Sequence, residues 1–85
     1  MKQVSVSVNA SKTLTRLPAN TARLIRKKIE QYATDPEALA NNVKALKGAK
    51  GVLRLRVGDW RVLFREDAAS VAVLAIGPRG SIYDE

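Results

Sequence analysis

The chain has 85 residues, and we expect residues 1–85 to form a single domain around one hydrophobic core. Fifteen Lys and Arg against eight Asp and Glu give a net charge of +7, which favours an acidic protein or a nucleic acid as the partner. The sequence contains no cysteine and no histidine, which excludes disulfides, a thiol nucleophile and the commonest metal ligand, and we expect no metal or other cofactor.

The N-terminal half predicts one strand and two helices. Residues 1–12 are too polar for a signal peptide, and no apolar run reaches the ~20 residues of a membrane span, so we expect a cytoplasmic protein with no membrane partner. Valine and serine alternate over residues 3–8, the period of a half-buried strand. Asn9 and Ser11 are candidate caps of a short helix that contains Leu14 and Leu17. A second helix begins at Pro18 and stops at Asp35-Pro36, with an apolar face of Ala22, Ile25, Ile29, Tyr32 and Ala33.

The C-terminal half predicts a connection and three strands. Residues 37–51 indicate a partly helical connection that ends in a glycine-containing turn. The run 52–64, VLRLRVGDWRVLF, predicts a hairpin whose turn is Gly58-Asp59, since glycine supplies the positive φ of a tight turn. Val71–Ile76 is almost entirely apolar, which is typical of a central strand covered on both faces.

The hairpin register sorts its residues onto two faces. With Gly58 and Asp59 as the turn, Arg56 lies opposite Arg61, and the apolar side carries Leu53, Leu55, Val57, Trp60, Val62 and Phe64. The other side carries Arg54, Arg56, Arg61 and Arg65. Like charges directly opposite each other cost roughly 0.2–1 kcal/mol, a cost that an anionic partner such as phosphate would relieve. Two helices on the apolar face would leave the arginine face open, and the order of elements predicts an α+β fold.

Arginines dominate the candidate functional residues. The sequence contains no nucleotide-binding glycine motif, no metal-ligand spacing and no Ser/His/Asp set. Arginine donates to phosphate in bidentate fashion and can stabilise the charge that develops during phosphoryl transfer. Arg79 and Tyr83 follow the last predicted strand and could extend the arginine face. Tyr83 could relay a proton only if neighbouring positive charge lowered its pKa.

Several segments resemble the RelE/ParE superfamily of bacterial toxin–antitoxin toxins. They are Leu46-Lys47-Gly48, the run from Leu53 to Phe64, Ala75-Ile76-Gly77-Pro78-Arg79 and Ile82-Tyr83. The resemblance implies a RelE-like fold, with a short antiparallel sheet and two N-terminal helices packed on one face. It also implies a toxin of a type II system whose open face cuts messenger RNA in the ribosome, the 2′-hydroxyl attacking the adjacent phosphate.

The resemblance also assigns roles to individual residues. Arg61, Arg79 and Tyr83 match catalytic positions of RelE-like toxins, and the expected RNA-binding residues are Lys47, Arg54, Arg56 and Arg65. Pro78 departs from the family, because many relatives have histidine there. Some active members have no histidine and use basic residues and tyrosine instead.

The resemblance implies three partners, a cognate antitoxin, the ribosome and mRNA, with an acidic or amphipathic antitoxin segment covering the arginine face. Two other functions stay open. One is a ParE-like toxin that inhibits DNA gyrase by protein contact, and the other is a basic binding module that has lost catalysis. The strand arginines, together with Arg79 and Tyr83, favour the endoribonuclease.

Overall fold

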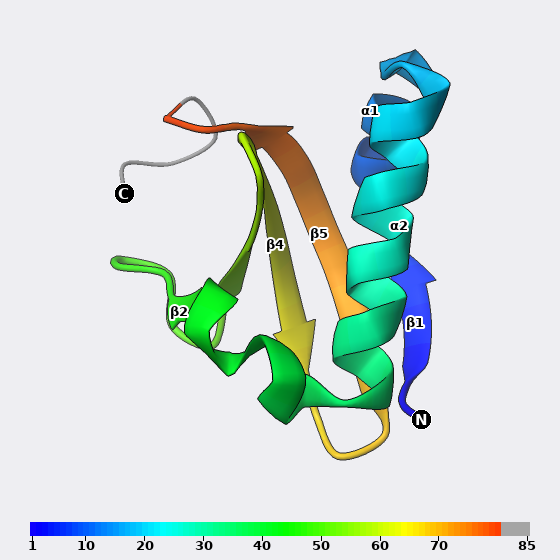
Figure 1. Ribbon diagram of the computed structural model, residues 1–85. Helices are drawn as coiled ribbons and strands as arrows, with labels where there is room; N and C mark the ends of the chain where they lie inside the picture. Colours follow the sequence, from blue (N-terminus) through cyan, green and yellow to red (C-terminus); the bar gives the residue numbers. More distant parts are fainter. Residues whose placement is uncertain (81–85) are drawn as a thin grey trace.

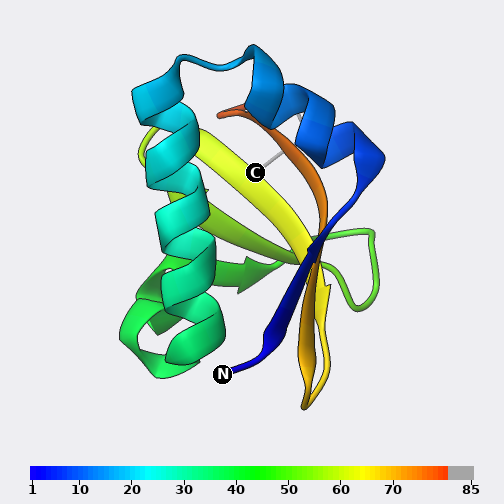
Figure 2. The same ribbon diagram turned by 90° about the vertical axis from the view of Figure 1, so that its right-hand side faces the viewer.

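A computed structural model describes residues 1–80. Along the chain the elements are β1 (Gln3–Val6), α1 (Val8–Arg16), α2 (Ala19–Thr34), the 3-10 helix η1 (Pro36–Asn42), β2 (Val43–Ala45), β3 (Leu53–Val57), β4 (Trp60–Glu66) and β5 (Ser70–Pro78). The five strands form one sheet in the order β1-β5-β4-β3-β2. The two helices lie on one side of this sheet, and the opposite side faces away from them (Figures 1 and 2).

The α+β architecture with two N-terminal helices on one sheet face is therefore confirmed. One detail differs from a purely antiparallel sheet, because β1 pairs with β5 in parallel while the other neighbours are antiparallel. In the sequence, the helices and three strands separate β1 from β5, so no tight turn joins these two strands. Their relative direction is therefore not restricted to the antiparallel one of a hairpin. As predicted, β5 is an interior strand, between β1 and β4.

The helix boundaries agree with the sequence patterns except at the first cap. The β1 strand ends at Val6 and not at Val8 as predicted, because Ser7 caps α1 and Val8 is the first residue of that helix. Asn9 and Ser11 are therefore not the caps. Ser7 Oγ accepts a hydrogen bond from the backbone N–H of Ala10 at 3.0 Å and donates one to the carbonyl oxygen of Leu74 at 2.6 Å. The Ser7 side chain therefore both begins the helix and ties it to β5. The second helix ends at Thr34, directly before Asp35-Pro36, as predicted.

The hairpin has the predicted register. Gly58 has a φ of +58° at the turn, and Val57 pairs with Trp60, Arg56 with Arg61 and Leu55 with Val62. The apolar face packs against α1 and α2 in the main core, where Leu55, Val57, Val62 and Phe64 are buried and Leu53 and Trp60 are partly buried. Burial of this continuous apolar surface is the main favourable contribution to folding.

A small second core lies on the opposite face of the sheet, where the sequence predicted only an open surface. It comprises Leu46, Val52 and Leu63, with Ala49, Leu74 and Ala75 packed against them. Leu63 is only 2% exposed, because the loop from Leu46 to Val52 folds over it. A register shift between Leu63 and Phe64, where β4 pairs with β5, lets β5 contribute Val73 to one core and Leu74 and Ala75 to the other.

A polar chain closes the end of the main core near the N-terminus. The hydroxyl of Tyr32 donates to Glu66 Oε1 at 2.7 Å, and Lys2 Nζ pairs with Glu66 Oε2 at 2.9 Å. Burial and the adjacent Glu66 carboxylate raise the pKa of Tyr32 well above its usual value. Within residues 1–80, no helix is both long and apolar enough to cross a membrane.

Candidate nucleic-acid interface

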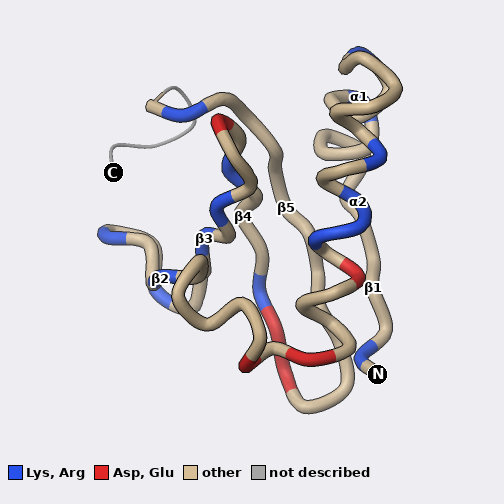
Figure 3. The backbone as a smooth tube through the Cα atoms, viewed as in Figure 1, with Lys and Arg blue, Asp and Glu red and all other residues tan. Residues whose placement is uncertain are grey.

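A polar hollow of about 580 Å³ lies on the sheet face opposite the main core, because Arg54 and Arg56, which line it, alternate along β3 with the core residues Leu55 and Val57. Its lining comprises Asn41, Asn42, Lys44, Arg54, Arg56, Gly58, Asp59, Arg61 and Arg79. Figure 3 shows Lys and Arg residues gathered along β2, β3 and β4 and just after β5 on this side of the molecule. We call this hollow the arginine groove.

The strands of the hairpin position three of its arginines. Arg54 and Arg56 are two residues apart on β3, so their side chains leave the sheet on the same face. Arg61 pairs directly with Arg56 across the strands. Arg56 is exposed, Arg54 is half-buried and Arg61 is buried. The three guanidinium groups therefore sit at different depths of one rigid sheet.

Arg61 is held by the hairpin turn. Its side chain is only 5% exposed, and Nη1 donates to the carbonyl oxygens of Gly58 and Trp60, both at 3.0 Å. Hydrogen bonds from a charged donor are stronger than neutral ones and fix the plane of the guanidinium group. They also lessen the repulsion expected between Arg56 and Arg61, because the partial negative charge on the two carbonyl oxygens offsets part of the positive charge of Arg61. Arg61 is consequently a structural residue as well as a groove residue.

Arg79 reaches the groove from the end of β5. Gly77 pairs with Arg61 in the sheet, and the backbone N–H of Arg79 donates to the carbonyl oxygen of Asp59 at 2.7 Å. This bond ties the segment after β5 to the hairpin turn. The Arg79 side chain is exposed and lines the groove together with the β3 and β4 arginines.

The fold brings four of the predicted site residues together and leaves two apart. Arg54, Arg56, Arg61 and Arg79 line the arginine groove, whereas Lys47 and Arg65 do not. Lys47 is exposed on the loop over the second core. A Cβ atom built on Gly51 would lie 3.3 Å from Arg65 Nη1, so the Arg65 guanidinium lies against the same loop. Tyr83 lies outside the described residues.

Four further groove residues were missed by the sequence analysis: Asn41, Asn42, Lys44 and Asp59. The first three come from η1 and β2, a segment whose apolar pattern is weak and whose path is set by the packing of Leu39 in the main core. Asp59 was read only as a turn residue. The groove thus combines five cationic side chains, two amides and one carboxylate, a set suited to an anionic, hydrogen-bonding ligand such as a phosphodiester.

Residues 1–80 contain no cluster of side chains that could coordinate a metal ion. No group of three or more Asp and Glu side chains in this part of the chain could hold a metal ion. The groove has one carboxylate, and its cations would oppose a metal ion.

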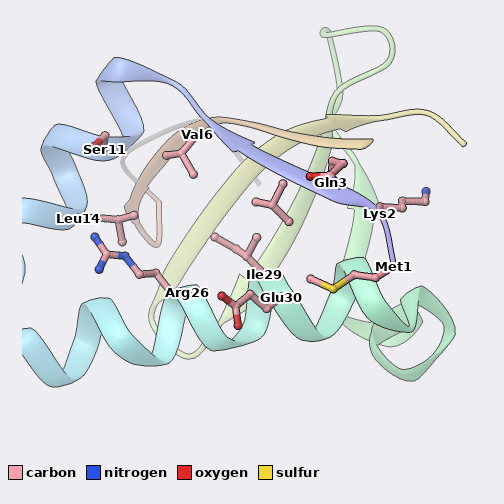
Figure 4. Close-up of a pocket in the computed structure, with 10 residues that line it drawn as sticks. Met1, Lys2, Gln3, Val6, Ser11, Leu14, Arg26, Ile29 and Glu30 are labelled. Atoms are coloured by element: carbon pink, nitrogen blue, oxygen red, sulfur yellow. The ribbon is translucent and has the colours of Figure 1, made fainter. Parts of the chain in front are cut away.

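A second, apolar groove lies at the other end of the sheet, between β1 and the helices. It has a volume of about 490 Å³, and its apolar lining is Met1, Val4, Val6, Leu14 and Ile29. Figure 4 shows Val6 and Leu14 on one side of this space and Ile29, Arg26 and Glu30 projecting from α2 on the other. An adjoining hollow of about 700 Å³ shares Leu14, Arg26 and Glu30 with it and adds Arg23 and Lys27. Together they form a continuous surface with an apolar floor and a mainly basic rim.

Comparison with known protein families identifies the family of this chain. The family model described as "ParE toxin of type II toxin-antitoxin system, parDE" matches residues 4–83. The chain therefore belongs to the RelE/ParE superfamily and is the toxin of a type II toxin–antitoxin system. No curated protein sequence matches it significantly.

Several solved toxin–antitoxin complexes contain a chain with the same fold. The archaeal RelE–RelB complex from Pyrococcus horikoshii OT3 matches with a TM-score of 0.77 and 24% identity, over 94% of this chain and 97% of that chain. The intact E. coli RelBE complex matches with a TM-score of 0.71 and 19% identity, over 92% and 96% of the two chains. The RelBE2 complex from Mycobacterium tuberculosis gives a TM-score of 0.66 at 21% identity, over 92% and 98%. The RelE-like fold is thereby confirmed.

Proposed function

We propose that this toxin is an endoribonuclease that cuts ribosome-bound messenger RNA and so inhibits translation. The observation that carries the proposal is the convergence of Arg54, Arg56, Arg61 and Arg79 on one hollow of about 580 Å³. Cleavage of RNA by its own 2′-hydroxyl needs a bound phosphodiester and fixed donors for the extra negative charge of the transition state. Guanidinium groups anchored on a sheet meet both needs without a metal or another cofactor.

The rigid placement of the arginines supports catalysis rather than loose electrostatic binding. Arg61 is fixed by two carbonyl groups of the turn, and the backbone of Arg79 is fixed to Asp59. Donors that are already in place stabilise a developing charge more than mobile ones do, since little reorganisation is needed. In this proposal Arg61 and Arg79 contact the scissile phosphate, and Arg54 and Arg56 bind the adjacent RNA backbone. Tyr83 assists proton transfer, and Lys47 and Arg65 contact RNA beyond the groove.

We further propose that a cognate antitoxin restrains the toxin, as RelB accompanies RelE in the similar complexes. The apolar groove beside β1 supports a docking role for part of that partner. Its basic rim, with Arg23, Arg26 and Lys27 against Glu30, suits an acidic amphipathic segment. Val6→Asp should weaken antitoxin binding, because Val6 lines this groove and is 41% exposed. Val8→Asp is the matched control, since Val8 is exposed and does not line it.

Inhibition of DNA gyrase is the alternative function, and the description of the matching family model favours it. A toxin that acts by protein contact has no need for buried and backbone-anchored arginines around a polar hollow. The arginine groove therefore weighs toward RNA cleavage. A basic module without catalysis would bind RNA through the same groove.

One pair of assays tests the proposal. Purified protein is added to ribosomes programmed with a defined mRNA, and cut sites are mapped by primer extension; in parallel, gyrase is assayed for stabilised cleaved DNA. We expect cuts within the ribosome-bound codon and no effect on gyrase. A 2′-deoxy substitution at the nucleotide before the cut should abolish cleavage. Trapped gyrase complexes with intact mRNA would establish the alternative, and no effect in either assay would leave the binding module.

A further inference from the structure

Asp59 differs in charge from every other side chain that lines the arginine groove. The remaining charged lining residues of the described chain are Lys44, Arg54, Arg56, Arg61 and Arg79, and the polar ones are Asn41 and Asn42. Arginine and lysine are protonated at neutral pH, and an amide is no base. A carboxylate is ionised at neutral pH and can accept a proton. Among the residues described, Asp59 is thus the one groove side chain equipped to act as a general base.

The backbone at Asp59 is held in place from two sides. Arg61 Nη1 donates to the carbonyl oxygens of the residues before and after Asp59 in the chain, Gly58 and Trp60, at 3.0 Å. The carbonyl oxygen of Asp59 itself accepts from the backbone N–H of Arg79 at 2.7 Å. The two arginines proposed to contact the scissile phosphate therefore also hold the backbone that carries this carboxylate. Because Asp59 lines the same hollow as these two arginines, a phosphate held by them would lie in the groove that the carboxylate faces.

We propose that Asp59 is the general base of the RNA cleavage, an inference that rests on the proposed endoribonuclease function. The Asp59 carboxylate removes the proton from the 2′-hydroxyl of the nucleotide before the cut. The 2′-oxygen then forms a bond to the adjacent phosphorus while the bond from phosphorus to the 5′-oxygen breaks. The departing 5′-oxygen takes a proton from water, and Asp59 returns its proton to the solvent. The products are a 2′,3′-cyclic phosphate and a 5′-hydroxyl end.

The electrostatics of the groove give this role a distinctive signature. A carboxylate among cations weakens the attraction of the groove for an RNA backbone, because it repels the phosphates. Removing its charge should therefore strengthen RNA binding, whereas removing a general base should slow cleavage by about 10²–10⁴-fold. A residue that served only the turn would not change binding and cleavage in opposite directions.

The test compares the wild type with Asp59→Asn and Asp35→Asn. Asparagine preserves the shape of the side chain and is itself favoured in turns, so the hairpin should be retained. Asp35 is exposed and does not line the groove, and its replacement makes the same change in net charge. Single-turnover cleavage is measured on programmed ribosomes, and affinity is measured separately with a short RNA that carries a 2′-deoxy nucleotide at the cut site. Thermal unfolding checks that each variant is folded.

We expect Asp59→Asn to bind the uncleavable RNA at least as tightly as the wild type and to cut at least 100-fold more slowly. Asp35→Asn should cut at the wild-type rate. Asp59→Glu, which keeps the carboxylate, should retain more activity than Asp59→Asn. This comparison distinguishes loss of the carboxylate from a loss of activity caused by damage to the turn. Cleavage by Asp59→Asn within about threefold of the wild type would overturn the assignment while leaving the endoribonuclease intact. A wild type that fails to cut would overturn both.

Discussion

Replacing Arg61 by alanine should destabilise the fold as well as disable the groove. The substitution removes two charge-assisted hydrogen bonds, to the carbonyl oxygens of Gly58 and Trp60, and empties a site that is 5% exposed. Each bond to a charged group contributes about 1.5–3 kcal/mol, and the restored hydration of the carbonyls offsets part of the loss. We therefore expect the free energy of unfolding to fall by about 2–4 kcal/mol. In a domain of this size that change lowers the midpoint of thermal unfolding by roughly 10–30 °C.

Urea and thermal unfolding, followed by circular dichroism, measure this loss. Arg56→Ala is the matched control, because Arg56 pairs with Arg61 across the hairpin but is exposed, so its removal should change stability by no more than about 0.5 kcal/mol. Cleavage by Arg61→Ala must be measured well below its own unfolding midpoint. If both variants unfold at the urea concentration of the wild type, the turn does not depend on Arg61, and our account of its burial is wrong.

Arg79→Ala should slow cleavage about 10²–10³-fold with an unchanged unfolding midpoint, because the variant loses the exposed side chain that we propose donates to the phosphate but keeps the backbone bond to Asp59. Wild-type cleavage in the programmed-ribosome assay would remove Arg79 from the site. Trp60→Ala should lower the free energy of unfolding by about 1–3 kcal/mol, less than for a fully buried indole, because Trp60 is only partly buried against the main core. Urea titration measures this loss, and no loss at all would mean that the indole is not packed. Tyr32→Phe should lower the free energy of unfolding by about 1 kcal/mol at pH 7 through loss of the 2.7 Å bond to Glu66. The raised pKa of Tyr32 contributes stability that is present below about pH 10 and is lost as the pH rises further. Alkaline titration of unfolding in both proteins should therefore give a smaller loss for Tyr32→Phe.

The hairpin shows how much of this fold could be predicted from the sequence. A two-residue turn signal and strict alternation determine its register, because a slip by one residue would expose the apolar face. That reasoning found Arg54, Arg56 and Arg61 on one face and Trp60 on the other. It could not find that Arg61 is buried, because alternation gives the face of a side chain but not its rotamer or its hydrogen-bond partners.

The rest of the groove depends on packing between distant segments. Lys44 lies in the short strand β2, which sequence patterns do not distinguish from a loop because it has three residues and pairs only at the edge of the sheet. The second core depends on the register shift between β4 and β5. The sequence of β5 is almost uniformly apolar, so its pattern does not indicate where such a shift occurs. The sequence analysis assigned Asp59 to the turn and gave its charge no role, because its neighbours in the groove come from five other segments: η1, β2, β3, β4 and the residues after β5.

The parallel pairing of β1 with β5 affects when the toxin can form during its synthesis. The strand β1 has its sheet partner at residues 70–73, so it stays unpaired until those residues have been translated. Contacts between such distant segments form late and slow the folding of a small domain. Arg79 follows β5 directly, so it also joins the groove only after residues 70–78 have been translated. A nascent chain that does not yet include Arg79 therefore carries no complete arginine groove.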